Sequence, residues 1–301
     1  MRSLAFLAEY SESDTMFDAV SCWEGKRKYT ISNYSEMGSA LIHECSREAG
    51  VPNGFALKSD ALELLDSGNC DLLVLPSMKD VSMEHKAQIP RLYEKGVNLI
   101  AVSDVDGLED LFGVKEERQE LEIHEVHYNG RSEAVYGCHA RFRYVPDGAE
   151  TIMTVDGGAP GILQTGRTML INTDVVSLGS RAIEPIDFVN ASLVVGRLIR
   201  QALQDEIRRL SRPLALGEGV GITLYETEDG RVEVLAIDYA PYDNQERTQR
   251  EASVRLYIGD VADVESEKPL FVGRKEGIVQ EIRFSVKPHE SVFLELSSNL
   301  C

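Results

Sequence analysis

The segment of residues 70–114 constrains the fold of this chain more than any other stretch. Residues 71–75 and 97–102 are short apolar runs, which are typical of strands buried on both faces. Between them, Ser82 can cap a helix and Gly96 can end it. Because parallel strands need a crossover connection, this segment predicts a strand–helix–strand unit within a parallel sheet.

The residues before this segment predict more of the same architecture. Residues 3–8 and 53–57 are expected to be strands, residues 34–49 a helix ended by Gly50, and residues 60–65 a short helix. The order of these elements predicts a doubly wound, flavodoxin-like α/β domain. Pro90 lies inside the helix that follows residue 82 and predicts a kink, if that helix is continuous.

The hydrophobic period changes after Lys115. Residues 121–128 and 133–138 are expected to form a hairpin, since Asn129-Gly130 between them is a strong turn signal. Three more short strands are expected at residues 150–155, 161–164 and 168–172. A long helix opened by Pro185 and ending near Leu210 should then close the first domain, at residues 1–211.

The last part of the chain, residues 212–301, lacks helical periodicity. It contains extended runs at regular spacing, which predict strands at residues 221–226, 232–238, 253–258, 278–286 and 291–296. Regular short strands with turn signals between them favour an antiparallel β-sandwich as the second domain.

Charge and cysteine content exclude several classes of function. The formal net charge is −19, which argues against binding to nucleic acid or to an anionic membrane. The five cysteines are odd in number, widely spaced and without a C-x-x-C pair, as expected for buried thiols in a reducing compartment. The N-terminal apolar run is too short for a signal peptide or a membrane span, so a cytoplasmic location is expected.

The carboxyl ends of the two central strands are where a parallel sheet places a site. They carry Ser77, Ser103, Asp104 and Asp106. Ser103-Asp104-Val105-Asp106-Gly107 occupies the place of a nucleophile elbow but lacks the glycine before the nucleophile. We expect Asp106 to be a helix N-cap, Ser103 to be a loop residue, and the local acidic residues to complement a helix dipole rather than to bind Ca²⁺.

Other motifs that could carry chemistry are weak. His124 and His127 should point to opposite faces of a strand, so no metal site is expected from them. Gly157-Gly158 reads as a turn between strands rather than as a phosphate loop. Trp23 and Tyr29 lie in a long polar loop, where they could stack on a sugar ring or anchor an interface. No cofactor is expected.

One resemblance covers most of the chain. The strand ending in Pro76, the helix closed by Glu94-Lys95-Gly96 and the motif Leu111-Phe112-Gly113-Val114 are similar to the class I glutamine-amidotransferase-like domain that follows the barrel in many glycoside hydrolases. The segment resembles the trimerisation domain of family 42 β-galactosidases, and galacto-N-biose/lacto-N-biose phosphorylases carry a comparable domain. The final β-domain follows in the same order as in those enzymes.

The resemblance implies a fold and an assembly role, and no catalytic residue. Amidotransferase relatives use a cysteine in the elbow, where this chain has Ser103, and glycosidase carboxylates lie on a barrel that this sequence does not contain. We therefore expect a non-catalytic accessory region of a β-galactosidase-like protein. It would form a homo-oligomer or associate with a catalytic barrel, and its loop at residues 9–33 could serve a neighbour's sugar site.

Two alternatives remain open from the sequence. One is an amidotransferase-like or esterase-like hydrolase with Ser103 or Cys138 as its nucleophile. The other is a free-standing carbohydrate-binding protein that uses aromatic residues of the sandwich, namely Tyr225, Tyr239, Tyr242 and Tyr257. Whether the chain is a whole gene product or part of a longer one is equally open.

Overall fold

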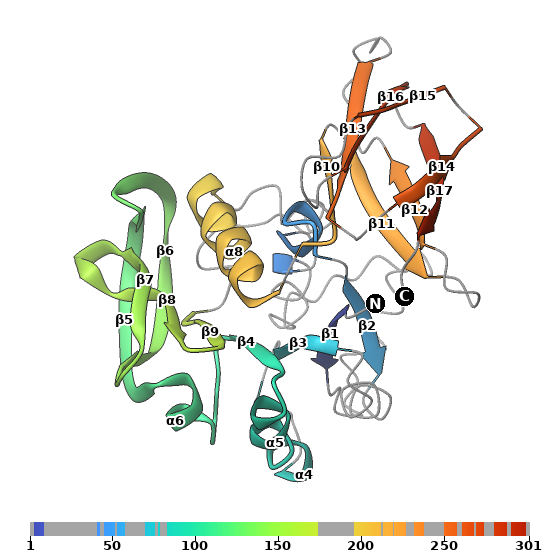
Figure 1. Cartoon of the computed structure of the whole chain (residues 1–301). Helices are drawn as coiled ribbons and strands as arrows, with labels where there is room; N and C mark the ends of the chain where they lie inside the picture. The colour runs from blue at the N-terminus through green and yellow to red at the C-terminus, as the bar shows by residue number, and fades with distance from the viewer. Residues whose placement is uncertain are drawn as a thin grey trace, which may run out of the picture. The chain divides into compact units, whose positions relative to one another are not determined.

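The computed structural model (Figure 1) divides the chain into two compact units. The larger unit comprises residues 2–45 and 54–211, and the smaller unit comprises Met1, residues 46–53 and residues 212–301. No helix among the described residues is long and apolar enough to cross a membrane. The structure describes residues 3–8, 41–42, 45–51, 53–57, 70–75, 78, 83–173, 196–211, 213–218, 220–226, 232–237, 250–257, 261–267, 269–273, 280–287 and 290–298.

The larger unit is built on a sheet that has nine strands in the described residues, in the order β2-β1-β3-β4-β9-β8-β7-β5-β6. The parallel pairings β1·β3, β3·β4 and β4·β9 confirm the expected parallel sheet around the central segment. The strands are β1 (Ser3–Ala8), β2 (Asn53–Leu57), β3 (Cys70–Leu75), β4 (Asn98–Val102), β5 (Val114–Tyr128), β6 (Arg131–Pro146), β7 (Glu150–Val155), β8 (Pro160–Thr165) and β9 (Thr168–Ile171).

The other half of the sheet is antiparallel, so the expected doubly wound α/β domain is correct only in part. The pairs β9·β8, β8·β7, β7·β5 and β5·β6 all run antiparallel, and the sheet as a whole is mixed. The cause lies in the short connections after Val114, which leave no room for crossover helices. The strands between β4 and β9 in the sequence therefore pair antiparallel, and β9 then pairs parallel with β4.

The hairpin β5–β6 follows the expected turn and extends further than expected. Asn129 and Gly130 both have positive φ, at 50° and 71°, as a two-residue type I′ turn requires. The two strands span 15 and 16 residues, from Val114 to Pro146, whereas the sequence predicted eight and six. Exposed charged residues continue the pairing beyond the apolar alternation that marked the strands.

Helices cover both faces of the sheet (Figure 1). The segment after residue 82, which was expected to form one kinked helix, forms two short helices, α4 (Met83–Lys86) and α5 (Ile89–Glu94). Pro90 lies in the first turn of α5. Proline is tolerated there because its missing N–H would have no helical acceptor. A further short helix, α6 (Glu109–Phe112), precedes β5 and ends at Gly113 with φ of 62°.

The opposite face is covered by α8 (Arg197–Leu210), whose buried stripe confirms the expected one. The expected helix does not run through Gly196, which has extended backbone and precedes the first helical residue. The Glu133 carboxylate of β6 accepts hydrogen bonds from the N–H groups of Arg197 and Leu198, at 3.0 and 2.7 Å. A carboxylate from a distant strand thus replaces the local capping residue that Gly196 cannot supply.

The core between the sheet and α5 is formed by alternate residues of the parallel strands. Leu73 and Leu75 of β3 and Leu99 and Ala101 of β4 are fully buried against the helices. Leu72, Val74, Ile100 and Val102 point to the other face and are equally buried. Burial on both faces is the reason that these strands read as continuous apolar runs in the sequence.

The smaller unit contains the expected β-sandwich, with sheet orders β10-β13-β16-β15 and β11-β12-β17-β14 in its described part. Residues of both sheets form one core, which includes Val254, Phe284, Val234 and Leu294. The short strands β10, β14 and β15 were not expected from the sequence. The bounds are β10 (Ala215–Glu218), β11 (Gly221–Glu226), β12 (Val232–Ile237), β13 (Arg250–Leu256), β14 (Val261–Glu265), β15 (Leu270–Val272), β16 (Gln280–Val286) and β17 (Ser291–Ser298).

Gly50 ends the helix that the sequence placed before it. Residues 41–42 and 45–48 are helical, and the N–H groups of Gly50 and Val51 bond to the carbonyls of Arg47 and Ser46. This pair of bonds is a Schellman motif, which needs a residue with positive φ at its centre. Gly50 has a φ of 79°. The expected helix at residues 60–65 lies outside the described residues.

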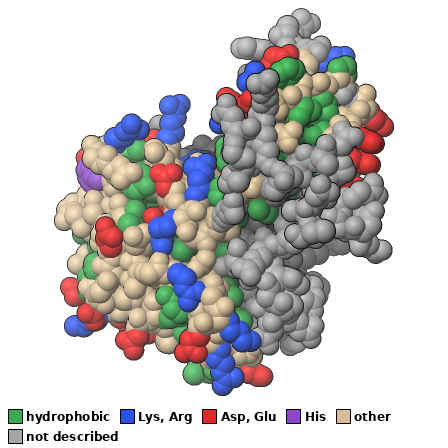
Figure 2. All heavy atoms as spheres, in the orientation of Figure 1, with side chains coloured by type: hydrophobic (Ala, Val, Ile, Leu, Met, Phe, Trp, Pro, Cys, Tyr) green, Lys and Arg blue, Asp and Glu red, His purple; other side chains and the backbone are tan. Residues whose placement is uncertain are grey.

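Acidic and basic side chains are interspersed over the described residues on the face that Figure 2 draws. The net charge of −19 is therefore not gathered into a single acidic patch on that face.

Candidate functional site at the carboxyl edge of the parallel strands

Ser103 follows β4 and has an unusual backbone conformation. Its φ is 65°, a region that side chains other than glycine seldom occupy. The Asp104 N–H bonds to the Val102 carbonyl at 2.7 Å, which closes a three-residue γ-turn centred on Ser103. The Ser103 N–H bonds to the Ile171 carbonyl of β9, also at 2.7 Å, and fixes the turn to the next strand. Such strained turns cluster at functional sites.

Asp104 is the centre of the site and is only 6% exposed. Its Oδ1 accepts hydrogen bonds from the Tyr144 hydroxyl and the Asp106 N–H, each at 2.9 Å. Its Oδ2 lies 2.9 Å from a guanidinium nitrogen of Arg143. A buried carboxylate needs this degree of partnering, because an unpaired buried charge is very costly.

Tyr144 and Arg143, which both partner the Asp104 carboxylate, come from β6. Burial raises the pKa of the Tyr144 hydroxyl above its ordinary value, so this group stays a donor. Its oxygen also accepts a hydrogen bond from the Val105 N–H at 3.1 Å. Burial opposes the charge of Arg143, but Asp104 and other nearby groups outweigh it, and the pKa of Arg143 lies above its ordinary value.

Asn172, directly after β9, holds Tyr144 in place from the other side. Its side-chain oxygen accepts from the Tyr144 N–H at 3.0 Å. Its side-chain nitrogen donates to the carbonyls of Tyr144 and Pro160 at 2.7 and 2.9 Å. Asn172 is fully buried, so these bonds satisfy a group that could not be left without partners. The site is therefore supported from β4, β6, β8 and β9.

The expectation that Asp106 caps a helix is wrong. The residue before α6 is Leu108, and no side chain caps that helix. The Leu108 N–H bonds to the Val105 carbonyl across a turn that has Gly107 at φ of 82°, and this extra turn separates Asp106 from the helix. Asp106 instead pairs with Lys86 of α4 at 2.8 Å, and this hydrogen bond lowers the pKa of its carboxyl.

The expected site residues are only partly brought together. Ser103, Asp104 and Asp106 lie in one turn at the carboxyl edge of β4. Trp23, Tyr29 and Ser77 lie outside the described residues, as does the predicted sugar-stacking loop. Tyr144, Arg143 and Asn172 were not predicted from the sequence, and no local signal marks them, because they meet Asp104 only through the folding of the antiparallel strands.

The chemistry available to this arrangement is limited. In the part of the chain that the structure describes, no hydrogen bond joins the Ser103 hydroxyl to a histidine or a carboxylate that could act as its base. Asp104 accepts two hydrogen bonds and forms an ion pair, so both of its oxygens are already engaged. The network holds a loop in place, with Asp104 paired to Arg143 and Asp106 paired to Lys86.

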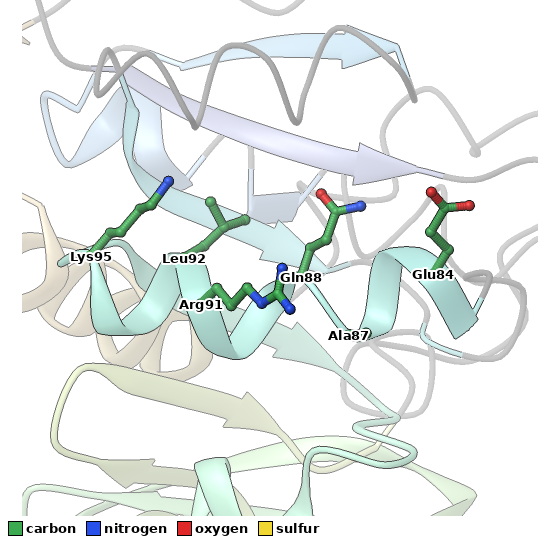
Figure 3. A pocket seen from close by; sticks show the side chains of 6 residues that line it. All are labelled: Glu84, Ala87, Gln88, Arg91, Leu92 and Lys95. Carbon is green, nitrogen blue, oxygen red and sulfur yellow. The ribbon is translucent and has the colours of Figure 1, made fainter.

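A hollow of about 390 Å³ lies along α4 and α5 (Figure 3). Glu84, Gln88, Leu92 and Lys95 point to the same side of the two helices, at spacings close to one helical turn. The hollow is lined by the helices and not by the strand ends, so it is separate from the site around Asp104.

The fold is shared with part of a glycoside hydrolase. The chain superposes on α-L-fucosidase isoenzyme 2 from Paenibacillus thiaminolyticus with a TM-score of 0.66 and 13% sequence identity. The match covers 99% of this chain and 49% of the fucosidase chain, so this chain spans about half the length of that protein. At this identity the likeness establishes the fold alone.

Two other solved structures are similar at lower scores. A β-galactosidase from the psychrophilic Marinomonas ef1 has a TM-score of 0.49 and 15% identity, over 98% of this chain and 38% of the other. A glutamine amidotransferase from Thermotoga maritima has a TM-score of 0.41 and 11% identity, over 70% of this chain and 98% of the other. No family model and no curated protein matches the sequence.

Proposed function

We propose that this chain is a non-catalytic accessory region of a glycoside-hydrolase-like protein and that it mediates assembly. The observation that carries the proposal is the fold likeness to the fucosidase, which covers 99% of this chain and about half of the longer protein. An α-L-fucosidase is by name a glycosidase, and the resemblance to β-galactosidase trimerisation domains implies the same context. The proposed partners are further copies of this chain or a catalytic barrel.

The site around Asp104 supports the non-catalytic part of the proposal. A catalytic carboxylate needs a free oxygen and a pKa matched to its task. Both oxygens of Asp104 are engaged by Tyr144, Arg143 and a backbone N–H, as in a structural network. In this proposal the loop at residues 9–33, with Trp23 and Tyr29, contributes to a sugar site of a neighbouring subunit.

Light scattering tests the assembly. We expect the purified chain to have a mass of at least twice that of the monomer at micromolar concentration. The second arm uses the chain expressed together with the gene product encoded directly upstream, and there we expect a complex of the two. A monomer in the first arm together with no complex in the second would overturn the proposal.

A hydrolase that uses Ser103 is the second candidate, and one observation favours it. The nucleophile of an α/β-hydrolase lies on a strained turn at the end of a strand. Ser103 lies on such a turn, with φ of 65°. A fluorophosphonate probe should then label the wild-type chain and not Ser103→Ala. Equal labelling of both proteins, or labelling of neither, rejects Ser103 as the nucleophile, and a thiol probe with Cys138→Ala tests the cysteine in the same way.

A further inference from the structure

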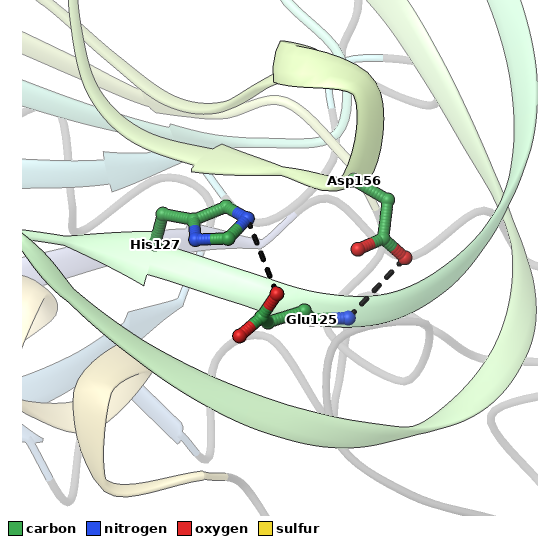
Figure 4. Close-up of side chains that lie close together, drawn as sticks. All are labelled: Glu125, His127 and Asp156. Atoms are coloured by element: carbon green, nitrogen blue, oxygen red, sulfur yellow. Dashed lines mark hydrogen bonds and ion pairs between the residues drawn. The ribbon is translucent and has the colours of Figure 1, made fainter.

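Two residues of β5 and one residue after β7 form a cluster that the function above does not use. A nitrogen of His127 and carboxylate oxygens of Glu125 and Asp156 all lie within 4.8 Å of one another (Figure 4). Glu125 and His127 are two residues apart on a strand, so they share a face, whereas the His124 ring lies 3.7 Å from the Glu122 carboxylate and is not part of the cluster. From the sequence only His124 and His127 were compared, which do not converge, and this same-face pair was missed.

The sheet register brings Asp156 to the other two residues. Val126 of β5 pairs with Val155 of β7, so the next residue along β7 lies beside Glu125. The Asp156 Oδ2 accepts hydrogen bonds from the backbone N–H groups of His124 and Glu125, the second at 3.2 Å. These bonds occupy one oxygen of the carboxylate and leave the other directed toward the cluster (Figure 4).

His127 is oriented by a neighbour on the other side of β5. Ser132 of β6 pairs with His127 in the register, and its hydroxyl lies 3.0 Å from the ring Nδ1. A hydrogen bond from Nδ1–H to this hydroxyl leaves Nε2 with its lone pair, 3.8 Å from the Glu125 Oε2. An oriented imidazole whose second nitrogen is hydrogen-bonded is the usual arrangement of a metal-ligating histidine.

The charges of the cluster favour a cation. Among the described residues, no lysine or arginine pairs with Glu125 or Asp156, in contrast to the acidic residues around β4. Two carboxylates beside a lone pair repel each other unless a positive ion lies between them. In a tetrahedral zinc site with bonds of about 2.0–2.1 Å, ligand atoms are about 3.4 Å apart, so small side-chain rotations close the observed distances.

We propose that Glu125, His127 and Asp156 bind a divalent transition-metal ion of the zinc type. The imidazole favours such an ion over Ca²⁺ or Mg²⁺, which prefer oxygen ligands alone. The three side chains are half-buried, so part of each is exposed to solvent. The cluster is therefore open to an ion from solvent, and a fourth position remains for water.

Calorimetric titration with Zn²⁺ tests the proposal, using the untagged, chelator-treated full chain at pH 7. We expect one site in the wild-type protein and loss of that site in His127→Ala, Glu125→Gln and Asp156→Asn. Ser132→Ala should weaken Zn²⁺ binding by about 10–100-fold, since it removes the partner of the ring Nδ1. Thermal unfolding with and without Zn²⁺ should show a stabilisation that the three ligand variants lack.

His124→Ala is the matched control, because its imidazole is the next one along β5 and lies outside the cluster, beside Glu122. It should bind Zn²⁺ as the wild type does. Wild-type chain that binds no Zn²⁺, or a His127→Ala variant that binds as tightly as the wild type, would overturn the proposal. Equal loss in His124→Ala and His127→Ala would do the same, since it indicates diffuse surface binding. Mg²⁺ binding with the affinity of Zn²⁺ would also overturn it, because it identifies an acidic patch instead.

Discussion

Single residues of the larger unit are fixed by partners far away in the sequence. Asp104 is held by Tyr144 and Arg143 of β6, and Tyr144 in turn by Asn172 after β9. Hydrogen bonds to a charged group contribute about 1.5–3 kcal/mol each, and losing one partner of a buried carboxylate costs at least as much. The turn at Ser103 can keep its strained backbone because these bonds hold both of its sides.

Because of Tyr128, the larger unit is expected to lose stability as the pH rises in the alkaline range. Its hydroxyl donates to the Asp205 carboxylate of α8 at 3.0 Å, and burial together with this contact raises its pKa to about 12. In the unfolded chain the pKa is the ordinary 10.0. The stabilisation is therefore complete below pH 10 and is lost as the pH rises through 10 toward 12, by about 2 kcal/mol in total.

Urea unfolding at pH 8, 10 and 11 measures this loss. Tyr128→Phe should be less stable than the wild type by about 1 kcal/mol at pH 8, because Asp205 loses a hydrogen-bond donor. The difference between the two proteins should shrink at pH 11. A constant difference across the three pH values contradicts the assignment of the raised pKa to Tyr128.

At the scale of elements, α8 depends on a strand for its start. Glu133 of β6 accepts hydrogen bonds from two N–H groups in the first turn of α8, and Gly196 offers no side chain for that purpose. Its negative charge also lies at the positive end of the helix dipole. The contact joins the hairpin β5–β6 to the helix that covers it.

Glu133→Gln should destabilise the chain by about 1–2 kcal/mol, since the amide has a single acceptor oxygen and no charge. The matched control is Glu120→Gln on β5, whose partner Arg141 is largely solvent-exposed, and there we expect less than about 0.5 kcal/mol. Urea unfolding gives both values, and amide hydrogen exchange at Arg197 and Leu198 should quicken in Glu133→Gln only. Equal effects of the two substitutions would show that the contact is no cap.

Elements whose signals are local were predicted well from the sequence. The strands of the central segment follow from uninterrupted apolar runs, the β5–β6 turn from Asn129-Gly130, and the sandwich core from the alternation in residues such as Ile282 and Phe284. The predictions were wrong where a residue distant in the sequence determines the start of a helix or the partner of a side chain. The helix α8 begins only after Gly196, where Glu133 caps it, and the Asp106 carboxylate pairs with Lys86 rather than capping the next helix.

The position of Ser103 and Asp104 in the fold could be predicted from the sequence, but the residues that surround them could not. The carboxyl edge of β4 follows from the parallel sheet, which made Ser103 and Asp104 visible in the sequence. Tyr144 and Asn172 reach that edge only because the antiparallel strands return to β9, and no spacing in the sequence encodes that return. The cluster of Glu125, His127 and Asp156 was missed for the same reason, since Asp156 comes from another strand.

At the scale of the whole molecule, the two units are not continuous in sequence. Residues 46–53 belong with residues 212–301, and the Gly50 carbonyl accepts hydrogen bonds from the N–H groups of Leu214 and Ala215, at 2.8 and 3.2 Å. A boundary at residue 212 alone would therefore cut away a segment that pairs with the first strand of the sandwich. The division into domains at residues 1–211 and 212–301 stays a prediction.

Gly50→Ala should strongly destabilise the contact between residues 46–53 and the first strand of the sandwich. A Cβ atom at Gly50 would lie 2.5 Å from the Ala215 carbonyl oxygen, and the positive φ adds strain. Gly130→Ala is the control, since Gly130 also has positive φ but has no atom within 4 Å of its added Cβ. We expect about 1 kcal/mol for the control and about 2–4 kcal/mol for Gly50→Ala in urea unfolding. Similar losses in both would rule out a close packing role for Gly50.

The position of β9 between β4 and β8 sets an order of events in folding. The strands β5, β6, β7 and β8 each pair with a strand close in sequence, and such pairings close short loops. The pairing β4·β9 joins strands that are far apart in the sequence, because β5, β6, β7 and β8 all lie between them. Contacts of high sequence separation form slowly. We therefore expect the edge that carries Ser103 and Asp104 to assemble later than the hairpins that support it.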